Sequence, residues 1–174
     1  MNIQDLFNLD KKIAFISGGA TGIGRMAAEA MAMAGARVLI ASRKGSLCAS
    51  VAEELNQKGY KGTVEGFEGD LSSEAGVEAV VKEIKIRTGQ LNILMNNAGR
   101  SWGAPLGSFP HGAWEKVMSL NVAGLFSLTQ SLIPLLEKSA THEDPARVIN
   151  VGSVMGEIPM GDGAYSYSAS KAAV

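Results

Sequence analysis

Residues 12–24 read KIAFISGGATGIG, and this stretch decides the fold. Its first six residues form a short apolar run, which is typical of a buried strand. A glycine-rich turn follows, with Gly18, Gly22 and Gly24 as its key positions, and the alanine- and methionine-rich stretch after it predicts a helix that ends at Gly35. A glycine turn between a strand and a helix lets the backbone approach a pyrophosphate, whose charge the helix N-terminus stabilises. We therefore expect a nucleotide-binding turn rather than an ordinary tight turn.

Strand-like and helix-like stretches alternate along the rest of the chain. Further strands are expected at residues 37–41, 62–67, 91–95 and 147–151, and further helices at residues 46–57, 73–87, 114–136 and from about residue 165. Ser73 is expected to cap the third helix, and Pro134 to kink or loosen the end of the fourth. The alternation predicts an α/β domain with a doubly wound parallel sheet, the Rossmann fold. Such a sheet binds ligands at the carboxyl ends of its strands.

The composition favours one globular domain over residues 1–174, because 46% of the residues are apolar. The net charge of −1 gives no indication of nucleic acid or an anionic membrane as a partner. We expect no secretory signal, no membrane-spanning run and a cytoplasmic location. Cys48 is the only cysteine and His111 and His142 lie far apart, so we expect neither a disulfide nor a metal site.

The predicted sheet is short for a dinucleotide-binding domain, which usually has about six or more strands. The pattern yields five, and the sequence ends at Val174, one turn after Lys171, without a helix cap. We therefore interpret the sequence as cut after the fifth strand and the start of the following helix. The fifth strand would then be an exposed edge, so the isolated chain is expected to be poorly soluble or inactive.

The residues after the second strand predict the cofactor. An NAD-binding fold usually carries an acid there to accept from the ribose hydroxyls. This chain has Ser42, Arg43 and Lys44 instead, and no acidic residue lies between Glu29 and Glu53. An arginine can pair with a 2′-phosphate, which an acid would repel. The sequence therefore favours NADPH over NADH; the alternative is two solvated basic residues.

Two further polar clusters follow predicted strands. Asp70 and Leu71 follow the third strand, where the carboxylate could accept from an adenine amino group or could serve as a loop or cap residue. Residues 96–99, Asn-Asn-Ala-Gly, follow the fourth strand. Two amides and a glycine suit a tight backbone passage beside a ligand, although a simple turn has the same composition.

The last predicted helix carries a tyrosine and a lysine on one face. At about 100° per residue, Tyr167 and Lys171 differ by roughly 40° in direction, whereas Tyr165 points elsewhere. A neighbouring ammonium favours the phenolate form of a tyrosine, which makes the phenol a usable proton donor nearer neutral pH. A surface pair one turn apart is the alternative. Ser153 has no histidine or aspartate partner in view, so a nucleophilic role is disfavoured.

These motifs together resemble the classical short-chain dehydrogenase/reductases, from about Asp10 to the end. The resemblance rests on Ser17-Gly18-x-x-x-Gly22-x-Gly24, Asn96-Asn97-Ala98-Gly99, Asn121, Ser153 and Tyr167-x-x-x-Lys171, in that order. Residues 101–103, 114–118 and 144–150 look most like the rhamnolipid-type 3-oxoacyl-[acyl-carrier-protein] reductases of that family. Ser17 stands where the family usually has threonine, but the hydroxyl is kept. The sixth and seventh strands and the segment that closes over the substrate have no counterpart.

The resemblance implies roles for particular residues. Tyr167 would be the general acid, Ser153 would hydrogen-bond the substrate carbonyl, Lys171 would hold the nicotinamide ribose and assist Tyr167, and Asn121 would anchor a proton-relaying water. The residues implied to contact NADP are Ser17, Gly18, Thr21, Gly22, Ile23, Gly24, Ser42, Arg43, Asp70, Leu71, Asn97, Ala98, Gly99, Tyr167 and Lys171. The resemblance also implies a homodimer or homotetramer built on the two long helices.

The expected function is NADPH-dependent reduction of a ketone to a secondary alcohol, with a 3-oxoacyl thioester as the candidate substrate, as in fatty acid metabolism. One alternative is an NAD(P)-dependent dehydrogenase of a small alcohol. Another is a catalytically inactive nucleotide-binding fragment. Every catalytic position is filled, which favours an enzyme.

Overall fold

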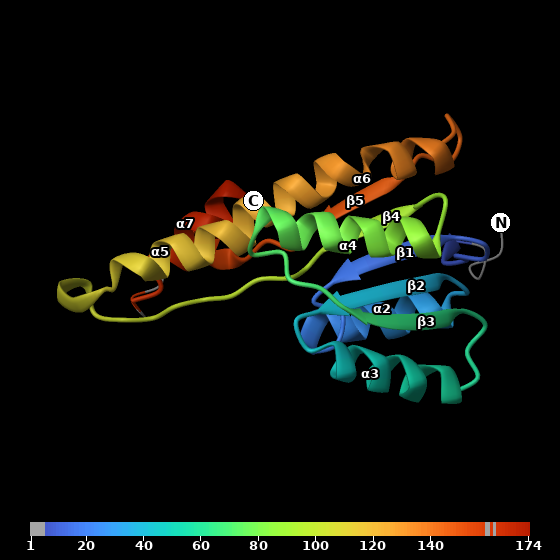
Figure 1. Cartoon of the computed structure of the whole chain (residues 1–174), viewed down its shortest axis with the longest axis horizontal. Coiled ribbons are helices and arrows are strands. Elements are labelled where there is room, and N and C mark those ends of the chain that lie inside the picture. The colour runs from blue at the N-terminus through green and yellow to red at the C-terminus, as the bar shows by residue number, and fades with distance from the viewer. Residues whose placement is uncertain (1–5, 159–160, 162) are drawn as a thin grey trace.

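The computed structural model describes residues 6–158, 161 and 163–174. These residues form a five-stranded sheet in the order β3-β2-β1-β4-β5, and all neighbouring strands are parallel (Figure 1). The strands are β1 (Ile13–Ser17), β2 (Arg37–Ser42), β3 (Thr63–Glu68), β4 (Ile93–Asn96) and β5 (Arg147–Asn150). The chain winds outward from β1 to β3, then returns to β4 on the other side of β1. This is the doubly wound α/β fold that the sequence predicted.

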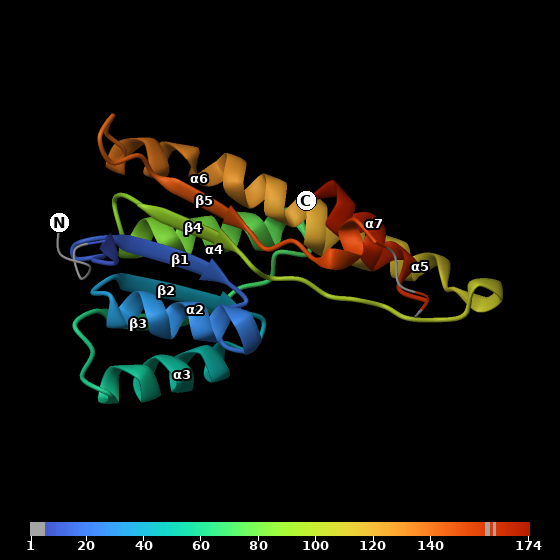
Figure 2. The same cartoon turned by 180° about the vertical axis from the view of Figure 1, so that it is seen from behind.

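The helices cover both faces of the sheet. They are α2 (Gly22–Met33), α3 (Gly45–Gln57), α4 (Glu74–Arg87), α5 (His111–Met118), α6 (Leu125–Ser139) and α7 (Tyr165–Ala173). A π-helical segment, Ser119–Gly124, joins α5 to α6, and two 3-10 turns lie at Leu106–Ser108 and Val154–Gly156. Figure 1 shows α4 in front of the sheet, and Figure 2 shows α2 on the opposite face.

Each face of the sheet contributes to its own hydrophobic core because side chains alternate along a strand. Phe15 and Leu39 pack against α4 and α6, whereas Ile16 and Ile40 pack against α2 and α3. All four side chains are fully buried. Burial on both faces explains why β1 and β2 read as continuous apolar runs in the sequence.

Several boundaries differ from those predicted. Helix α2 begins at Gly22, three residues before the expected start at residue 25. Strand β4 runs from Ile93 to Asn96, and the fourth predicted helix extends at both ends, from His111 to Ser139. The fourth helix continues through Pro134, because the buried leucines of α6 pack against the core and outweigh one missing backbone hydrogen bond. The predicted cap is confirmed, since the Ser73 hydroxyl accepts a hydrogen bond from the Gly76 amide.

The segment His111–Ser139 is long and apolar enough, by length and composition, to cross a membrane. The sequence had predicted no such run, and on these two criteria that prediction was wrong. The segment holds no unbroken apolar run of that length, because Asn121 and Gly124 interrupt it, but it is apolar on average. The core helix of a soluble protein meets the same criteria, and Leu128 and Leu132 of this helix are fully buried in the core beside α4.

Strand β5 forms one edge of the sheet. All four of its residues are exposed, and within the described part of the chain β5 pairs with β4 alone. The exposed edge that the sequence predicted for the fifth strand is therefore observed.

Candidate active site

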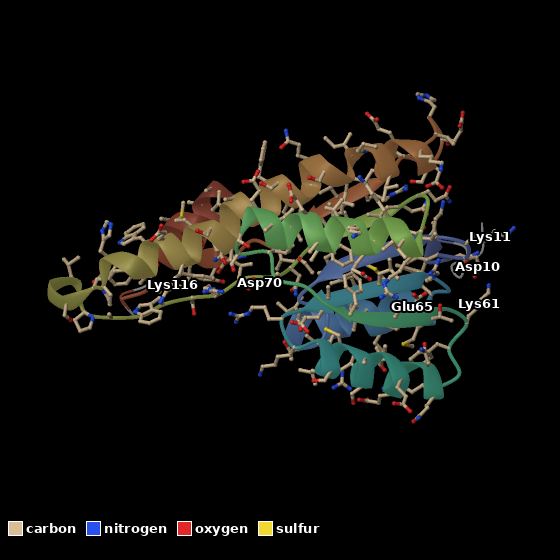
Figure 3. All side chains as sticks on the ribbon, viewed as in Figure 1. Asp10, Lys11, Lys61, Glu65, Asp70 and Lys116 are labelled. Atoms are coloured by element: carbon tan, nitrogen blue, oxygen red, sulfur yellow. The ribbon has the colours of Figure 1, made fainter. Side chains whose placement is uncertain are left out.

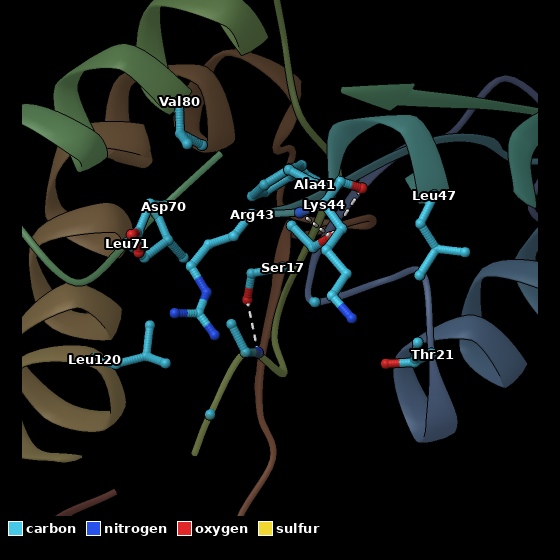
Figure 4. Close-up of a pocket in the computed structure, with 15 residues that line it drawn as sticks. Ser17, Thr21, Ala41, Arg43, Lys44, Leu47, Asp70, Leu71, Val80 and Leu120 are labelled. Atoms are coloured by element: carbon cyan, nitrogen blue, oxygen red, sulfur yellow. Dashed lines mark hydrogen bonds between the residues drawn. The ribbon is translucent and has the colours of Figure 1, made fainter. Parts of the chain in front are cut away.

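Two adjoining cavities lie at the carboxyl ends of the strands. The first has a volume of about 230 Å³, and its lining includes Ser17, Gly18, Thr21, Ser42, Arg43, Lys44, Asp70, Leu71, Ala98 and Gly99 (Figure 4). The second has a volume of about 500 Å³, and its lining includes Ile23, Asn97, Gly99, Arg100, Tyr167 and Lys171. Gly99 lines both cavities, so one elongated ligand could occupy the two together.

Ser17 ties the glycine turn after β1 to the loop after β4. Its hydroxyl oxygen accepts hydrogen bonds from the backbone amides of Asn97 at 3.1 Å and Ala98 at 3.0 Å. The Asn97 side-chain amide donates in return to the carbonyls of Ser17 at 3.0 Å and Gly18 at 3.1 Å. The serine hydroxyl makes this connection without the methyl group of the family's usual threonine.

The glycine turn brings the start of α2 close to this connection. Gly18 and Gly22 have φ of +67° and +52°, a region that favours glycine. A Cβ on Gly24 would lie 2.4 Å from Asn97 Nδ2 and 2.5 Å from the Gly18 carbonyl, so only glycine fits there. Thr21 precedes the helix and makes no side-chain cap. The first amides of α2 therefore remain available to an anion, as a pyrophosphate site requires.

The far end of the first cavity carries positive charge. Arg43 and Lys44 are exposed, and no carboxylate of the described residues forms an ion pair with either. Figure 4 shows the Arg43 guanidinium in the space between Leu71 and Ser17. Asp70 lines the same cavity and also accepts a hydrogen bond from the Ser72 amide at 3.0 Å. The loop role considered for Asp70 is thus observed, and its other carboxylate oxygen makes no hydrogen bond with the residues that the structure describes.

Tyr167 and Lys171 lie side by side on α7. The Lys171 Nζ is 5.8 Å from the centre of the Tyr167 ring, and both residues line the second cavity. The Tyr165 ring instead packs edge-on against Phe109, with ring centres 5.4 Å apart, and does not line that cavity. The arrangement of the two tyrosines is the one that helical spacing predicted.

The Lys171 ammonium is held between α7 and the end of β5. Its Nζ donates a hydrogen bond to the Val151 carbonyl at 2.5 Å. Partial burial lowers the pKa of Lys171 below the usual value of a lysine, because desolvation penalises its charged form. The carbonyl contact fixes the ammonium beside Tyr167, where it can act on a phenol or on a ribose hydroxyl.

Asn121 lies in the π-helical segment, a feature that often occurs at functional sites. It is 1% exposed, and its side-chain oxygen accepts from the Arg100 amide while its side-chain nitrogen donates to the Arg100 carbonyl, both at 2.9 Å. The same nitrogen donates to the Ser170 hydroxyl, which donates to the Tyr167 carbonyl. Asn121 therefore joins the loop after β4 to the helix that carries Tyr167. The water-anchoring role remains a prediction.

Asn121→Ala is expected to lower the free energy of unfolding by at least about 2 kcal/mol, because it removes the hydrogen bonds of a buried side chain to the Arg100 amide, the Arg100 carbonyl and the Ser170 hydroxyl. Chemical denaturation measures this. Ser119→Ala is the matched control, since it truncates a hydroxyl in the same π-helical segment. Equal stability of the Asn121 variant and the parent would contradict this account of the network.

Ser153 is near the second cavity but is absent from its lining. It precedes the 3-10 turn Val154–Gly156, and its hydroxyl oxygen accepts a hydrogen bond from the Met155 amide at 3.2 Å. Gly152 and Met155, on either side of it, do line the cavity. The structure thus brings Tyr167 and Lys171 together and leaves Ser153 beside them, while Asn121 lies behind the site.

Several lining residues were missed by sequence reasoning. They are chiefly Leu47 in the first cavity and Arg100, Ser101, Gly103, Val151, Gly152 and Met155 in the second. A signal existed for Arg100, because it directly follows the Asn-Asn-Ala-Gly sequence at the end of β4. Residues in the β5–α7 loop gave no such signal, since composition alone does not say which way a loop turns.

Residues 12–174 match the family model described as short chain dehydrogenase. The chain belongs to this family. It is 48% identical over 168 residues to the "Rhamnolipids biosynthesis 3-oxoacyl-[acyl-carrier-protein] reductase" of Pseudomonas aeruginosa, covering 97% of this chain and 64% of that protein. It is 32% identical to the "3-oxoacyl-[acyl-carrier-protein] reductase FabG" of Aquifex aeolicus, covering 94% and 64%.

Solved structures give the same result. The "Pseudomonas aeruginosa RhlG/NADP active-site complex" superposes with a TM-score of 0.89 at 48% identity, covering 96% of this chain and 64% of that one. A gluconate 5-dehydrogenase from Burkholderia cenocepacia, in complex with NADP and tartrate, gives 0.84 at 30% identity, covering 99% and 65%. The chain spans just under two thirds of the length of these relatives.

Proposed function

We propose that the whole protein reduces a ketone to a secondary alcohol with NADPH, and that the ketone is a 3-oxoacyl thioester. One observation carries this proposal: the cavity that holds Tyr167 and Lys171 meets the cavity of the glycine turn and Arg43 at a shared residue, Gly99. A proton donor is therefore placed next to a site suited to a dinucleotide.

The described residues fit NADPH along its length. The tight approach at Gly24 and the free amides at the start of α2 suit the pyrophosphate. Arg43 would pair with the 2′-phosphate, and Asp70 would accept from the adenine amino group. Lys171 would bind the nicotinamide ribose. When bound, the cofactor supplies the hydride that reduces the carbonyl carbon.

The protein's own residues supply the proton and the polarisation. The Tyr167 hydroxyl gives its proton to the alkoxide that develops on the substrate oxygen, and the Lys171 ammonium stabilises the phenolate left behind. The Ser153 oxygen accepts from the Met155 amide, which leaves its own hydrogen to donate to the carbonyl. Donors aimed at developing charge are commonly the largest contribution to such a reaction.

The relatives support the choice of substrate and cofactor. Both similar proteins compared above are named as 3-oxoacyl-[acyl-carrier-protein] reductases, and both similar structures compared above are NADP complexes. We extend both properties to this protein as part of the proposal, together with a cytoplasmic location.

We also propose a homo-oligomer, a dimer or tetramer, built on the long helices. Trp114 on α5 and Phe126 and Ile133 on α6 are large, apolar and exposed. Apolar side chains that gather along a helix face favour an interface between copies.

Arg43→Asp is expected to abolish or invert the preference for NADPH over NADH. Losing a charge-assisted contact of this kind costs about 1.5–3 kcal/mol, and the new acid would repel the 2′-phosphate. Calorimetric titration of parent and variant with both cofactors measures the change, and Lys138→Asp, at an exposed position in the last turn of α6, controls for net charge. Equal affinities of the parent for NADPH and NADH would contradict the assignment.

A further inference from the structure

Arg100 is fixed at the wall of the catalytic cavity by its backbone. Its amide and carbonyl are both bound by the buried side chain of Asn121, at 2.9 Å each. A residue clamped at both backbone groups projects its side chain from one defined point. Arg100 lines the second cavity together with Tyr167 and Lys171.

The Arg100 guanidinium has no protein partner among the described residues. Its Nε is buried from solvent and makes no hydrogen bond with any of them. No carboxylate of the described residues forms an ion pair with it, whereas Arg87, the other arginine with a buried unbonded Nε, pairs with Glu65 and Glu83. A guanidinium without an anion is therefore a distinctive feature of this cavity.

The other charges at the cavity leave this positive charge uncompensated. The lining contains one further charged side chain, Lys171, and no aspartate or glutamate among the described residues. The remaining lining groups are apolar or neutral, as Asn97, Ser101 and Tyr167 are. A buried donor that lacks an acceptor is unfavourable, and a ligand that supplies the acceptor recovers this cost.

We propose that Arg100 is an oxyanion-binding residue of the catalytic cavity. The planar fork of a guanidinium matches a carboxylate or a phosphate with two parallel hydrogen bonds. This inference deepens the proposed function and rests on it for the identity of the ligand, which can come from two sources.

One source is the cofactor and the other is the substrate. Ile23, the second residue of α2, lines the same cavity as Arg100. A pyrophosphate bound at the N-terminus of α2 would therefore face the cavity that Arg100 lines. Tyr167 and Gly152 also line it, so the carboxylate of a free 3-oxo acid, the unesterified counterpart of the proposed thioester, would lie there as well. In both cases Arg100 meets two or more oxygens of one anionic group.

The test compares Arg100→Gln, Arg100→Lys and Lys116→Gln in the whole protein. Lys116 projects from α5 (Figure 3) and lines neither cavity, so its substitution removes the same unit of charge away from the site. One arm measures binding of NADPH and of inorganic pyrophosphate by calorimetry. The other arm measures kcat/KM for 3-oxobutanoate and for its methyl ester, in which a methyl group removes the negative charge of the carboxylate.

Arg100→Gln is expected to raise the Kd for NADPH and pyrophosphate, or to lower kcat/KM for 3-oxobutanoate relative to its ester, by about tenfold or more. Loss of a hydrogen bond to a charged group has an effect of this size. Weaker binding of NADPH and pyrophosphate assigns the anion to the cofactor, and a lost preference for the acid over its ester assigns it to the substrate. Arg100→Lys should recover part of the loss, and Lys116→Gln should behave as the parent.

The proposal is overturned if Arg100→Gln binds NADPH and pyrophosphate as the parent does and keeps the parent's ratio of acid to ester. A parent protein that binds pyrophosphate but neither binds NADPH nor reduces either ketone would instead refute the proposed function. In that event the pyrophosphate titration of Arg100→Gln still decides the role of Arg100.

Discussion

Tyr167→Phe is expected to lower kcat for a 3-oxoacyl thioester at least about a hundredfold in the whole protein, while the Kd for NADPH stays nearly unchanged. General acid catalysis typically contributes about 10²–10⁴-fold, and phenylalanine removes the proton donor alone. The ring at position 167 remains beside Lys171, so the cavity keeps its shape. Steady-state NADPH oxidation and calorimetric binding measure the two quantities separately.

Tyr165→Phe is the matched control for this experiment. It removes the same hydroxyl from the same helix two residues away, but the Tyr165 ring packs on Phe109 and lies outside the catalytic cavity. Most activity should therefore remain. If the Tyr165 variant lost turnover while the Tyr167 variant kept it, the assignment of the proton donor would be wrong.

Gly24→Ala is expected to raise the Kd for NADPH by about tenfold or more and to lower the free energy of unfolding by about 1–3 kcal/mol. The added methyl group would meet Asn97 Nδ2 at 2.4 Å and the Gly18 carbonyl at 2.5 Å. Relief of this clash requires Asn97 to release the carbonyls of Ser17 and Gly18, which separates the glycine turn from the loop after β4.

Gly107→Ala serves as the control for the glycine variant. Gly107 lies in an exposed 3-10 turn and does not have a positive φ, and a methyl group added to it would meet no atom within 4 Å. Its substitution should leave cofactor binding and stability close to those of the parent. Calorimetry and thermal melting of both variants test the contrast, and normal NADPH binding by Gly24→Ala would show that the close approach is unimportant.

The sequence predicted the elements whose signal is local. The buried strands were recognisable because helices cover both faces of a parallel sheet. Side chains on both sides of such a strand are therefore apolar, as in residues 13–16. The pairing of Tyr167 with Lys171 followed from helical spacing alone. The placement of Arg43 in the first cavity was predictable because the residues after the second strand of a dinucleotide-binding fold face the ribose of the cofactor.

Long-range contacts could not be predicted in this way. The sequence around Asn121 predicts an ordinary α-helix, but the backbone there is π-helical. The Asn121 side chain makes hydrogen bonds to Arg100 and Ser170, which are distant in sequence. The need for glycine at position 24 depends on Asn97, a residue that follows strand β4 and is distant in sequence. The missing partner of the Arg100 guanidinium is likewise visible only when the surrounding residues are in place.

The central claim is that these residues form a working NADPH-dependent ketone reductase, and product formation tests it most directly. The whole protein is incubated with NADPH and a 3-oxoacyl thioester, and both the cofactor consumed and the 3-hydroxyacyl thioester formed are quantified. The account predicts one 3-hydroxyacyl product for each NADPH oxidised, with both lost in Tyr167→Phe. Tight NADPH binding without any hydroxyacyl product, across thioesters and simple 3-oxoesters, would contradict the account and identify a nucleotide-binding module instead.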